Sequence, residues 1–317
     1  MMPAPTALSG EFSSDQSAIG NRQLAISKLL LFAGDIKISH SIFAMPWAIL
    51  ATVMAWDVTG RGAIWGKLGL VVVCMIAART IAMAANRLLD AKLDALNPRT
   101  ARRAIPSGQL SRRFYFLVLL GCVALFITCC LAFETRYGNP WPLALSLPVL
   151  MFLSSYPLLK RFSRLCHYYL GAALALAPIC AWLAIAGTLD WPPLVMAIAV
   201  MTWTAGFDII YACQDHASDI ATGVHSVPAK LGIARGLWVA RLTHLACALA
   251  LIALGWFSPQ LNALYFIGVA VAITLLIIEH AIVTPDDLSK VGLAFFTING
   301  VISLIVGMLG VIDVVRI

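Results

Sequence analysis

The chain has 317 residues, of which 61% are hydrophobic and 12% are charged, and its mean hydropathy is +0.90. Soluble domains carry about 25% charged residues, so this composition excludes an ordinary soluble domain and indicates an integral membrane protein. The formal net charge is +7. We expect the lipid bilayer as a partner, and no nucleic acid.

The amino-terminal segment differs in composition from the rest of the chain. Residues 1–20 are small and polar, and they lack the basic stretch followed by an apolar core that marks a secretory signal. We therefore interpret residues 1–24 as a disordered cytoplasmic tail and residues 25–317 as a single transmembrane domain.

Nine apolar segments follow, each long enough to cross the hydrocarbon core as a helix of about 20 residues. In chain order they lie at 26–56, 64–86, 114–134, 141–160, 167–187, 192–213, 236–256, 261–283 and 291–312. We predict an all-α integral membrane protein with nine transmembrane helices around a central cavity. The two longest connections, 87–113 and 214–235, carry most of the unusual polar residues, and we expect them to cap the cavity on the cytoplasmic side.

The first span contains three ionisable residues, Asp35, Lys37 and His40. On a helix, Lys37 and His40 share a face because they are three residues apart, whereas Asp35 and His40 do not share a tight stripe. We expect Lys37 and His40 to line the cavity. A structural intramembrane ion pair is the alternative.

The second span ends in an acidic stripe. Asn86, Asp90 and Asp94 follow one another at intervals of four residues, so on a helix they lie on one face. Arg79 lies seven residues before Asn86 on the same face. There it either neutralises a carboxylate or contacts substrate in the cavity.

The sixth span ends in a second acidic cluster, within the stretch DIIYACQDHASD at 208–219. Asp215 and Asp219 are four residues apart, and Asp208 lies seven residues before Asp215 on the same stripe. Solvated helix ends would explain either cluster alone. Two clusters with the same spacing on one side of the membrane favour a functional site, because ionisable groups at membrane depth are costly.

Lysines and arginines concentrate in alternate connections, which by the positive-inside rule face the cytoplasm. The connections after the second, fourth and sixth spans hold most of them, whereas the alternate connections hold only Arg61 and Arg136, with Lys67 nearby. This pattern predicts a multi-pass protein of a bacterial-type inner (plasma) membrane, with both acidic clusters on the cytoplasmic side.

The two clusters supply carboxylate and amide oxygens but no histidine or cysteine at ligand spacing, a donor set that suits Mg²⁺. Mg²⁺ held by a few carboxylates commonly completes its coordination with water and substrate phosphate oxygens. Nearby cations could hold a diphosphate and neutralise its charge as it leaves. These cations are Lys92, Arg99, Arg102, Arg103 and Lys230. A basic loop beside a membrane can equally be attracted to anionic lipid.

Several motifs resemble those of one family, the UbiA superfamily of membrane-embedded aromatic prenyltransferases. NRLLDAKLD (86–94) with NPRTARRAIPSG (97–108) resembles its first signature, and DIIYACQDHASD (208–219) with GVHSVPAKLG (223–232) resembles its second. YPLLKR (156–161) looks like a shorter third element, and DIKISHSIFAMPWA (35–48) is similar to the start of the 4-hydroxybenzoate polyprenyltransferase-like branch. The resemblance extends from about residue 25 to the end.

The resemblance implies transfer of a polyprenyl group from a polyprenyl diphosphate to an aromatic acceptor such as 4-hydroxybenzoate, in ubiquinone- or menaquinone-type quinone biosynthesis. It also implies two Mg²⁺ ions that bridge the acidic motifs and the donor diphosphate. The matched metal ligands are Asn86, Asp90, Asp215 and Asp219. The implied catalytic carboxylates are Asp90, Asp94, Asp208, Asp215 and Asp219. Tyr156, Lys160 and Arg161 are implied to contact the donor or its diphosphate.

Two positions depart from the family pattern. Many members have aspartate directly after the motif asparagine, where this chain has Arg87. Members acting on 4-hydroxybenzoate often have arginine after the central aspartate, where this chain has Ala91 followed by Lys92. Both departures concern the acceptor more than the reaction, so the same chemistry on a different acceptor is an alternative.

A different class of function, a cation-coupled transporter, also uses intramembrane carboxylates. Clustering of the acids at one membrane face, instead of at the midplane, favours the enzyme. A phospholipid-synthesis enzyme that uses aspartate pairs and Mg²⁺ would carry both pairs in one continuous glycine-containing stretch. Here four helices separate them.

Overall fold

The computed structural model describes residues 23, 26–37 and 43–316, and these are almost entirely helical. A first helix covers residues 26–35. The later helices are α2 (Met45–Val58), α3 (Trp65–Leu96), α4 (Arg112–Tyr137), α5 (Trp141–Leu159), α6 (Cys166–Ala186), α7 (Trp191–Ala212), η2 (Cys213–Asp215), α8 (His216–Thr222), α9 (Val227–Leu231), α10 (Ile233–Phe257), α11 (Ala263–Ile282), α12 (Val291–Leu293), η3 (Ala294–Ile298) and α13 (Asn299–Arg316). Apart from Gln23, the predicted tail at 1–24 lies outside the described residues, and so does His40.

Eight helical segments among the described residues are long and apolar enough to cross a membrane. The predicted span at 26–56 is not one helix, because its first helical stretch ends at Asp35 and α2 has only 14 residues. At about 1.5 Å per residue, α2 is about 21 Å long, which is shorter than the roughly 30 Å hydrocarbon core. The all-helical fold with membrane-length helices is confirmed, but the described residues do not confirm the count of nine spans.

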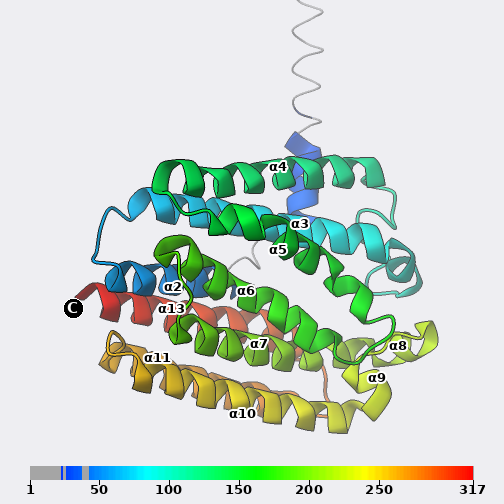
Figure 1. Cartoon of the computed structure of the whole chain (residues 1–317). Helices are drawn as coiled ribbons and strands as arrows, with labels where there is room; N and C mark the ends of the chain where they lie inside the picture. The colour runs from blue at the N-terminus through cyan, green and yellow to red at the C-terminus, as the bar shows by residue number, and fades with distance from the viewer. Residues whose placement is uncertain (1–22, 24–25, 38–42, 317) are drawn as a thin grey trace, which may run out of the picture.

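The long helices lie side by side (Figure 1). α3 and α4 pack together at one edge with α5 against both, and α10 and α11 pack together at the opposite edge. The short helix α2 lies between, in contact with α3, α6 and α13. Most of its apolar side chains are buried, with Leu50 and Met54 at 0% exposed.

Close approach of α6 to α7 depends on a glycine. A Cβ at Gly171 would lie 2.3 Å from the backbone oxygen of Met201, so no larger residue fits unless one of the two helices moves. Small residues at helix contacts let backbones approach closely in membranes, where van der Waals packing drives association. On the outside, Leu242, Leu245 and Leu249 of α10 are each more than half exposed. Such a face is typical of contact with lipid.

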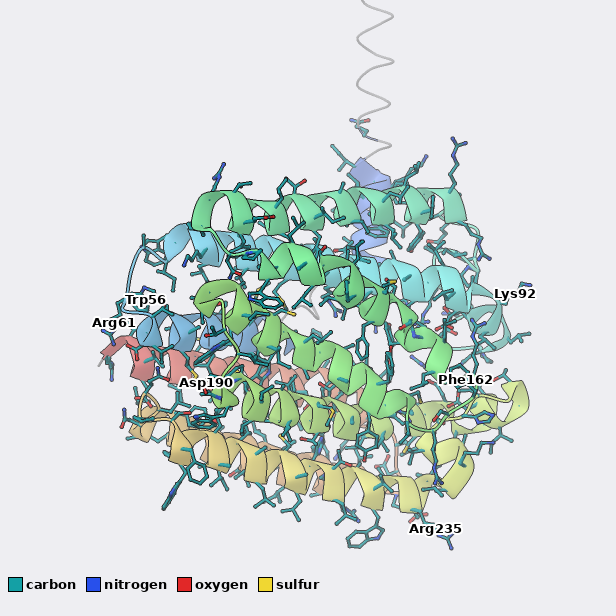
Figure 2. All side chains as sticks on the ribbon, in the orientation of Figure 1. Trp56, Arg61, Lys92, Phe162, Asp190 and Arg235 are labelled. Carbon is teal, nitrogen blue, oxygen red and sulfur yellow. The ribbon has the colours of Figure 1, made fainter. Side chains whose placement is uncertain are left out.

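The polar connections divide between the two ends of the bundle (Figure 2). Lys92, Phe162 and Arg235 lie at one end of the helices, and Trp56, Arg61 and Asp190 lie at the other. The connection after α3 and the segment from η2 to α9 both belong to the end with Lys92, where α8 contacts α3.

Hydrogen bonds tie the last helix down at the end opposite Lys92. Arg61 Nη2 donates to the backbone oxygen of Val314 at 3.0 Å. Asp313 Oδ2 accepts from the backbone N–H groups of Asn262 and Tyr265 at 2.8 and 2.7 Å. A carboxylate at the start of α11 is favourable because the first backbone N–H groups of a helix have no partners within it.

Candidate active site

The first acidic cluster occupies the last turns of α3. Asp90 is fully buried and Asp94 is 5% exposed, because the four-residue spacing keeps both on the inner face of the helix. Asn86 donates from Nδ2 to Asp90 Oδ2 at 2.9 Å. Its Oδ1 accepts from Nη1 of Arg87 at 2.8 Å, so both polar atoms of the amide have partners within the protein.

Cations from two segments flank the first cluster. Lys160, directly after α5, donates from Nζ to Asp90 Oδ2 at 2.6 Å, and Arg161 Nη2 lies 3.7 Å from Asp90 Oδ1. Arg103, in the connection after α3, donates to Asp94 Oδ1 at 2.7 Å. The residues matched to the third family element thus lie beside residues matched to the first.

The second cluster lies at the end of α7 and in η2 and α8, and the connection after α3 reaches it. Arg99 donates to Asp215 from Nε at 2.9 Å and from Nη2 at 2.5 Å, a two-point contact that suits a planar guanidinium. Asn97 Nδ2 donates to Asp215 Oδ1 at 2.9 Å, and Arg99 Nη1 donates to the Tyr211 hydroxyl at 2.7 Å. The two acidic clusters therefore lie at the same end of the bundle (Figure 1), and the connection after α3 contacts Asp215 of the second.

The other two acids of the second cluster contact a histidine and a serine. Asp208 Oδ2 lies 2.7 Å from Nδ1 of His167, at the start of α6. Asp219 Oδ2 accepts from the Ser226 hydroxyl at 2.6 Å. Neither acid pairs with a lysine or arginine among the residues that the structure describes.

Positive charges lie close together in this site. Partial burial lowers the pKa of the Lys37 ammonium, and the charges of Arg103, Arg99 and Arg87 lower it further. Burial also opposes the charge of Arg99, but its contacts with Asp215 and Tyr211 raise its pKa above the usual value. Cations that repel one another in this way favour an anion bound between them.

Arg87, the first departure from the family pattern, has a partner 52 positions away in the sequence. The guanidinium is 3% exposed, and it donates from Nε to Asp35 Oδ2 at 2.9 Å and from Nη2 to the Asp35 backbone oxygen at 2.7 Å. Asp35 also accepts from the Tyr115 hydroxyl and from the backbone N–H of Ala104. Asp35 thereby joins the first helix to α3 through Arg87, to α4 through Tyr115 and to the connection between them through Ala104.

Two oxygen atoms of the first cluster have no hydrogen-bond partner among the described residues. Asp90 Oδ1 and Asp94 Oδ2 are buried and accept no hydrogen bond from the described residues. An unsatisfied buried oxygen is costly, so a bound cation fits here. Within the described ranges, however, no three His, Cys, Asp or Glu side chains converge closely enough to form a metal site. The residues therefore fit Mg²⁺ that takes its remaining ligands from water and substrate.

An apolar cavity runs beside the inner face of α3, towards its amino-terminal side. It is lined by side chains of α3, α4, α5 and α6 and measures about 1220 Å³ with the space at its open side included. Ligand pockets are lined predominantly by apolar side chains, so the character of this lining suits an apolar chain. Its few polar lining residues include Arg79 and Tyr156. Arg79 Nη2 donates to the backbone oxygen of Lys37 at 3.3 Å, while its buried Nε has no partner among the described residues.

Other predicted site residues lie outside this arrangement. Lys92, Arg102 and Lys230 are exposed and form no ion pair with any described residue. Lys37 follows the end of the first helix with a φ of 49°. The helical spacing that pairs Lys37 with His40 therefore does not hold at Lys37.

Sequence reasoning missed four partners of the motif residues. They are Asn97, Tyr115, His167 and Ser226. Each reaches a motif residue or its neighbour from another segment, so spacing along one helix could not identify it. For His167 a signal was present, because an ionisable side chain inside an apolar span is usually functional.

Comparison with known proteins decides the family. Residues 44–301 match the UbiA prenyltransferase family. The chain belongs to this family. It is 29% identical over 281 residues to the 4-hydroxybenzoate octaprenyltransferase of Edwardsiella ictaluri. The alignment covers 87% of this chain and 94% of that relative. The chain is thus a membrane prenyltransferase, and the predicted transferase class is confirmed.

Solved structures of UbiA homologues have the same fold. The apo homologue from Aeropyrum pernix K1 superimposes with a TM-score of 0.77 at 27% identity, covering 87% of this chain and 98% of that one. A homologue from Archaeoglobus fulgidus, bound to DMAPP and Mg²⁺, gives a TM-score of 0.67 at 16% identity over 90% of this chain and 99% of that one. Membership of this family favours the enzyme over the transporter.

Proposed function

We propose that this UbiA-family prenyltransferase joins a polyprenyl group from a polyprenyl diphosphate to a ring carbon of an aromatic acid, in quinone biosynthesis. The central observation is the buried pair Asp90 and Asp94, flanked by cations beside an apolar cavity. Each has one oxygen that accepts no hydrogen bond from the described residues. The acceptor named for the Edwardsiella relative and the DMAPP and Mg²⁺ bound by the Archaeoglobus homologue support this assignment.

Asn86, Asp90, Asp215 and Asp219 are the proposed metal ligands, and Asp94 joins them because its Oδ2 has no partner among the described residues. Bound Mg²⁺ would neutralise charge on the leaving diphosphate. Arg99 and Asn97 must release the Asp215 oxygens before that carboxylate can coordinate an ion. The released Arg99 is then free to contact the diphosphate.

In the proposed reaction the C–O bond of the allylic diphosphate ester breaks, and its electron pair leaves with the diphosphate. A ring carbon of the acceptor forms the new C–C bond and then loses its proton. Lys160, Arg161 and Arg103 surround the acids, where they can stabilise the leaving charge. The apolar cavity excludes water, which would otherwise capture the allylic cation.

Arg79 is the proposed contact for the acceptor carboxylate. It lies on the cavity wall and forms no ion pair with any described residue. A guanidinium in an apolar wall gains most from a carboxylate that arrives with the ligand. We take 4-hydroxybenzoate as the first candidate, and the departures at Arg87 and Ala91 make another aromatic acid the alternative.

The remaining features of the proposal concern the setting of the enzyme. We propose one catalytic domain at 25–317 after a cytoplasmic tail, with α2 as a short ninth membrane helix and the two long connections covering the site. The concentration of basic residues at the end with Lys92 supports a site on the cytoplasmic face of a bacterial-type inner membrane.

The test is an assay of purified protein with Mg²⁺, geranyl diphosphate and a panel of hydroxylated aromatic acids. We expect a prenylated product that EDTA abolishes, and a loss of at least about 100-fold in kcat for Asp90→Asn, since even indirect partners of a metal cost 10–100-fold. Asp286→Asn, in the exposed loop after α11, serves as the control and should retain wild-type turnover. Full activity of Asp90→Asn would contradict the metal assignment. Ion flux without product would favour a transporter.

Acceptor recognition needs its own experiment. Arg79→Gln should lower kcat/KM about 10- to 100-fold for acceptors that carry a carboxylate, the usual contribution of a hydrogen bond to a charged group. The same variant should lose little on phenols that lack the carboxylate. Equal losses on both kinds of acceptor would mean that Arg79 does not contact the carboxylate.

A further inference from the structure

Residues 225–227 all lie close to the acids of the site. One of them contacts an acid directly, and the other two contact hydrogen-bond partners of acids. The backbone N–H of His225 donates to the backbone oxygen of Lys160 at 2.7 Å, and Lys160 holds Asp90. The Ser226 hydroxyl donates to Asp219 at 2.6 Å. The backbone N–H of Val227 donates to Nε2 of His167 at 3.1 Å.

His167 is the central partner, and its contacts fix its tautomer. A ring nitrogen that accepts a hydrogen bond carries no proton, so Nε2 is unprotonated. The ring proton is therefore on Nδ1, which donates to Asp208 Oδ2 at 2.7 Å. The imidazole is 3% exposed, so no water competes for either nitrogen. The ring thus connects the segment 225–227 to the carboxylate of Asp208 in one orientation.

The carboxylate that His167 holds is accessible from the site. The Asp208 side chain is 24% exposed, against 3% for His167. Only Oδ2 of Asp208 is used by His167, so Oδ1 remains for a ligand. Since carboxylates that bind a metal are commonly aligned by a further hydrogen bond, this geometry is typical of a residue that acts through another.

We propose that His167 is a positioning residue for the prenyl-transfer site. The neutral ring orients the Asp208 carboxylate and holds the segment 225–227 in place beside it. Ser226 orients the Asp219 carboxylate through its hydroxyl. This inference rests on the proposed function, because Asp219 is a proposed metal ligand and Asp208 is one of the implied catalytic carboxylates. It predicts that the side chain at position 167 must donate one hydrogen bond and accept another.

The experiment compares two substitutions that differ in this respect. Glutamine has a donor NH₂ and an acceptor oxygen and can replace both contacts, whereas leucine can replace neither. The readouts are calorimetric binding of Mg²⁺ with inorganic pyrophosphate, kcat and KM for prenyl transfer, and the melting temperature. We expect His167→Leu to weaken binding and lower kcat about 10- to 100-fold, and His167→Gln to stay within roughly threefold of wild type.

The control is the neighbouring Tyr168→Phe. It removes a 2.7 Å hydrogen bond between Tyr168 of the same helix and Thr243 of α10, a contact in which no acid takes part. It should change neither binding nor kcat, and any loss of thermal stability common to Tyr168→Phe and His167→Leu measures the structural cost alone. Should His167→Leu fail to fold, Ser226→Ala removes the contact with Asp219 without altering α6, and it should weaken pyrophosphate binding.

The outcomes separate this inference from the proposed function. If wild type binds Mg²⁺ and pyrophosphate but transfers no prenyl group, the proposed reaction fails, while the binding series still decides the role of His167. Equal binding and kcat in His167→Leu and wild type, or equal losses in His167→Leu and His167→Gln, would overturn the inference. Absence of Mg²⁺-pyrophosphate binding by wild type would overturn both.

Discussion

Arg87 carries a charge that is almost completely buried, and Asp35 is the carboxylate that compensates it. The two side chains are 3% and 7% exposed, and they meet at 2.9 Å. Removing one partner of such a pair leaves an uncompensated buried charge, which costs about 3–5 kcal/mol, more than the pair itself contributes over an apolar replacement.

We therefore expect Asp35→Asn to lower the free energy of unfolding by about 3–5 kcal/mol, because Arg87 keeps its charge without a counter-ion. The measurement is unfolding of the purified protein by SDS titration, followed by circular dichroism. The double variant Asp35→Asn/Arg87→Met removes both charges and should recover most of the loss. A single variant as stable as wild type would show that the pair is not the link between the first helix and α3.

The sequence predicts a site residue when the spacing that identifies it lies within one helix. Asp90 and Asp94 are four residues apart within α3, so periodicity alone places them on one face. Asp215 and Asp219 have the same spacing, but the structure divides them between η2 and α8. His167 and Ser226 contact the acids from other elements, and no spacing along the chain encodes such contacts. Arg87 was noted as a departure, but its partner Asp35 could be identified only in three dimensions.

At the scale of elements, the spans with uninterrupted apolar runs were predicted well and the first one was not. α4 (Arg112–Tyr137) covers the predicted 114–134, and α6 (Cys166–Ala186) nearly coincides with 167–187. The run at 26–56 is apolar enough for one helix. Its helix nevertheless stops at Asp35, and Lys37 has a left-handed φ of 49°. Hydropathy does not detect such a helix end, because it measures side-chain transfer and not backbone conformation.

The contact between α6 and α7 makes a prediction about one glycine. Gly171→Ala places a Cβ 2.3 Å from the backbone oxygen of Met201, and we expect a destabilisation of about 1–3 kcal/mol or more, as for other overpacked contacts. The measurement is the melting temperature in detergent by intrinsic fluorescence.

Gly121→Ala on α4 is the matched control for this substitution. It meets nothing within 4 Å, and alanine is the better helix former by about 0.5–1 kcal/mol. Its melting temperature should therefore equal or exceed that of wild type. If Gly171→Ala had the same melting temperature as Gly121→Ala, α6 and α7 would be able to move apart without loss of stability.

For the molecule as a whole, the unpartnered oxygens of Asp90 and Asp94 predict stabilisation by ligand. Mg²⁺ with inorganic pyrophosphate should raise the melting temperature, because a ligand at 100 times its Kd adds about 2.7 kcal/mol to the stability of the folded state. Asp90→Asn/Asp94→Asn should lose this shift, and Asp286→Asn in the loop after α11 should keep it. A shift of equal size in the double variant would locate the ion elsewhere.

The last helix leaves the bundle at the end opposite the acids (Figure 1). α13 ends at Arg316, and the contact of Val314 with Arg61 places this helix end beside Arg61, whereas Lys92 marks the other end in Figure 2. A reporter fused to the carboxyl terminus would therefore emerge on the far side of the bilayer from the catalytic machinery. The reporter can be a phosphatase that folds only outside the cytoplasm. Its activity would show that the carboxyl terminus lies outside, and it would therefore assign the prenyl-transfer chemistry to the inner leaflet without any measurement of turnover.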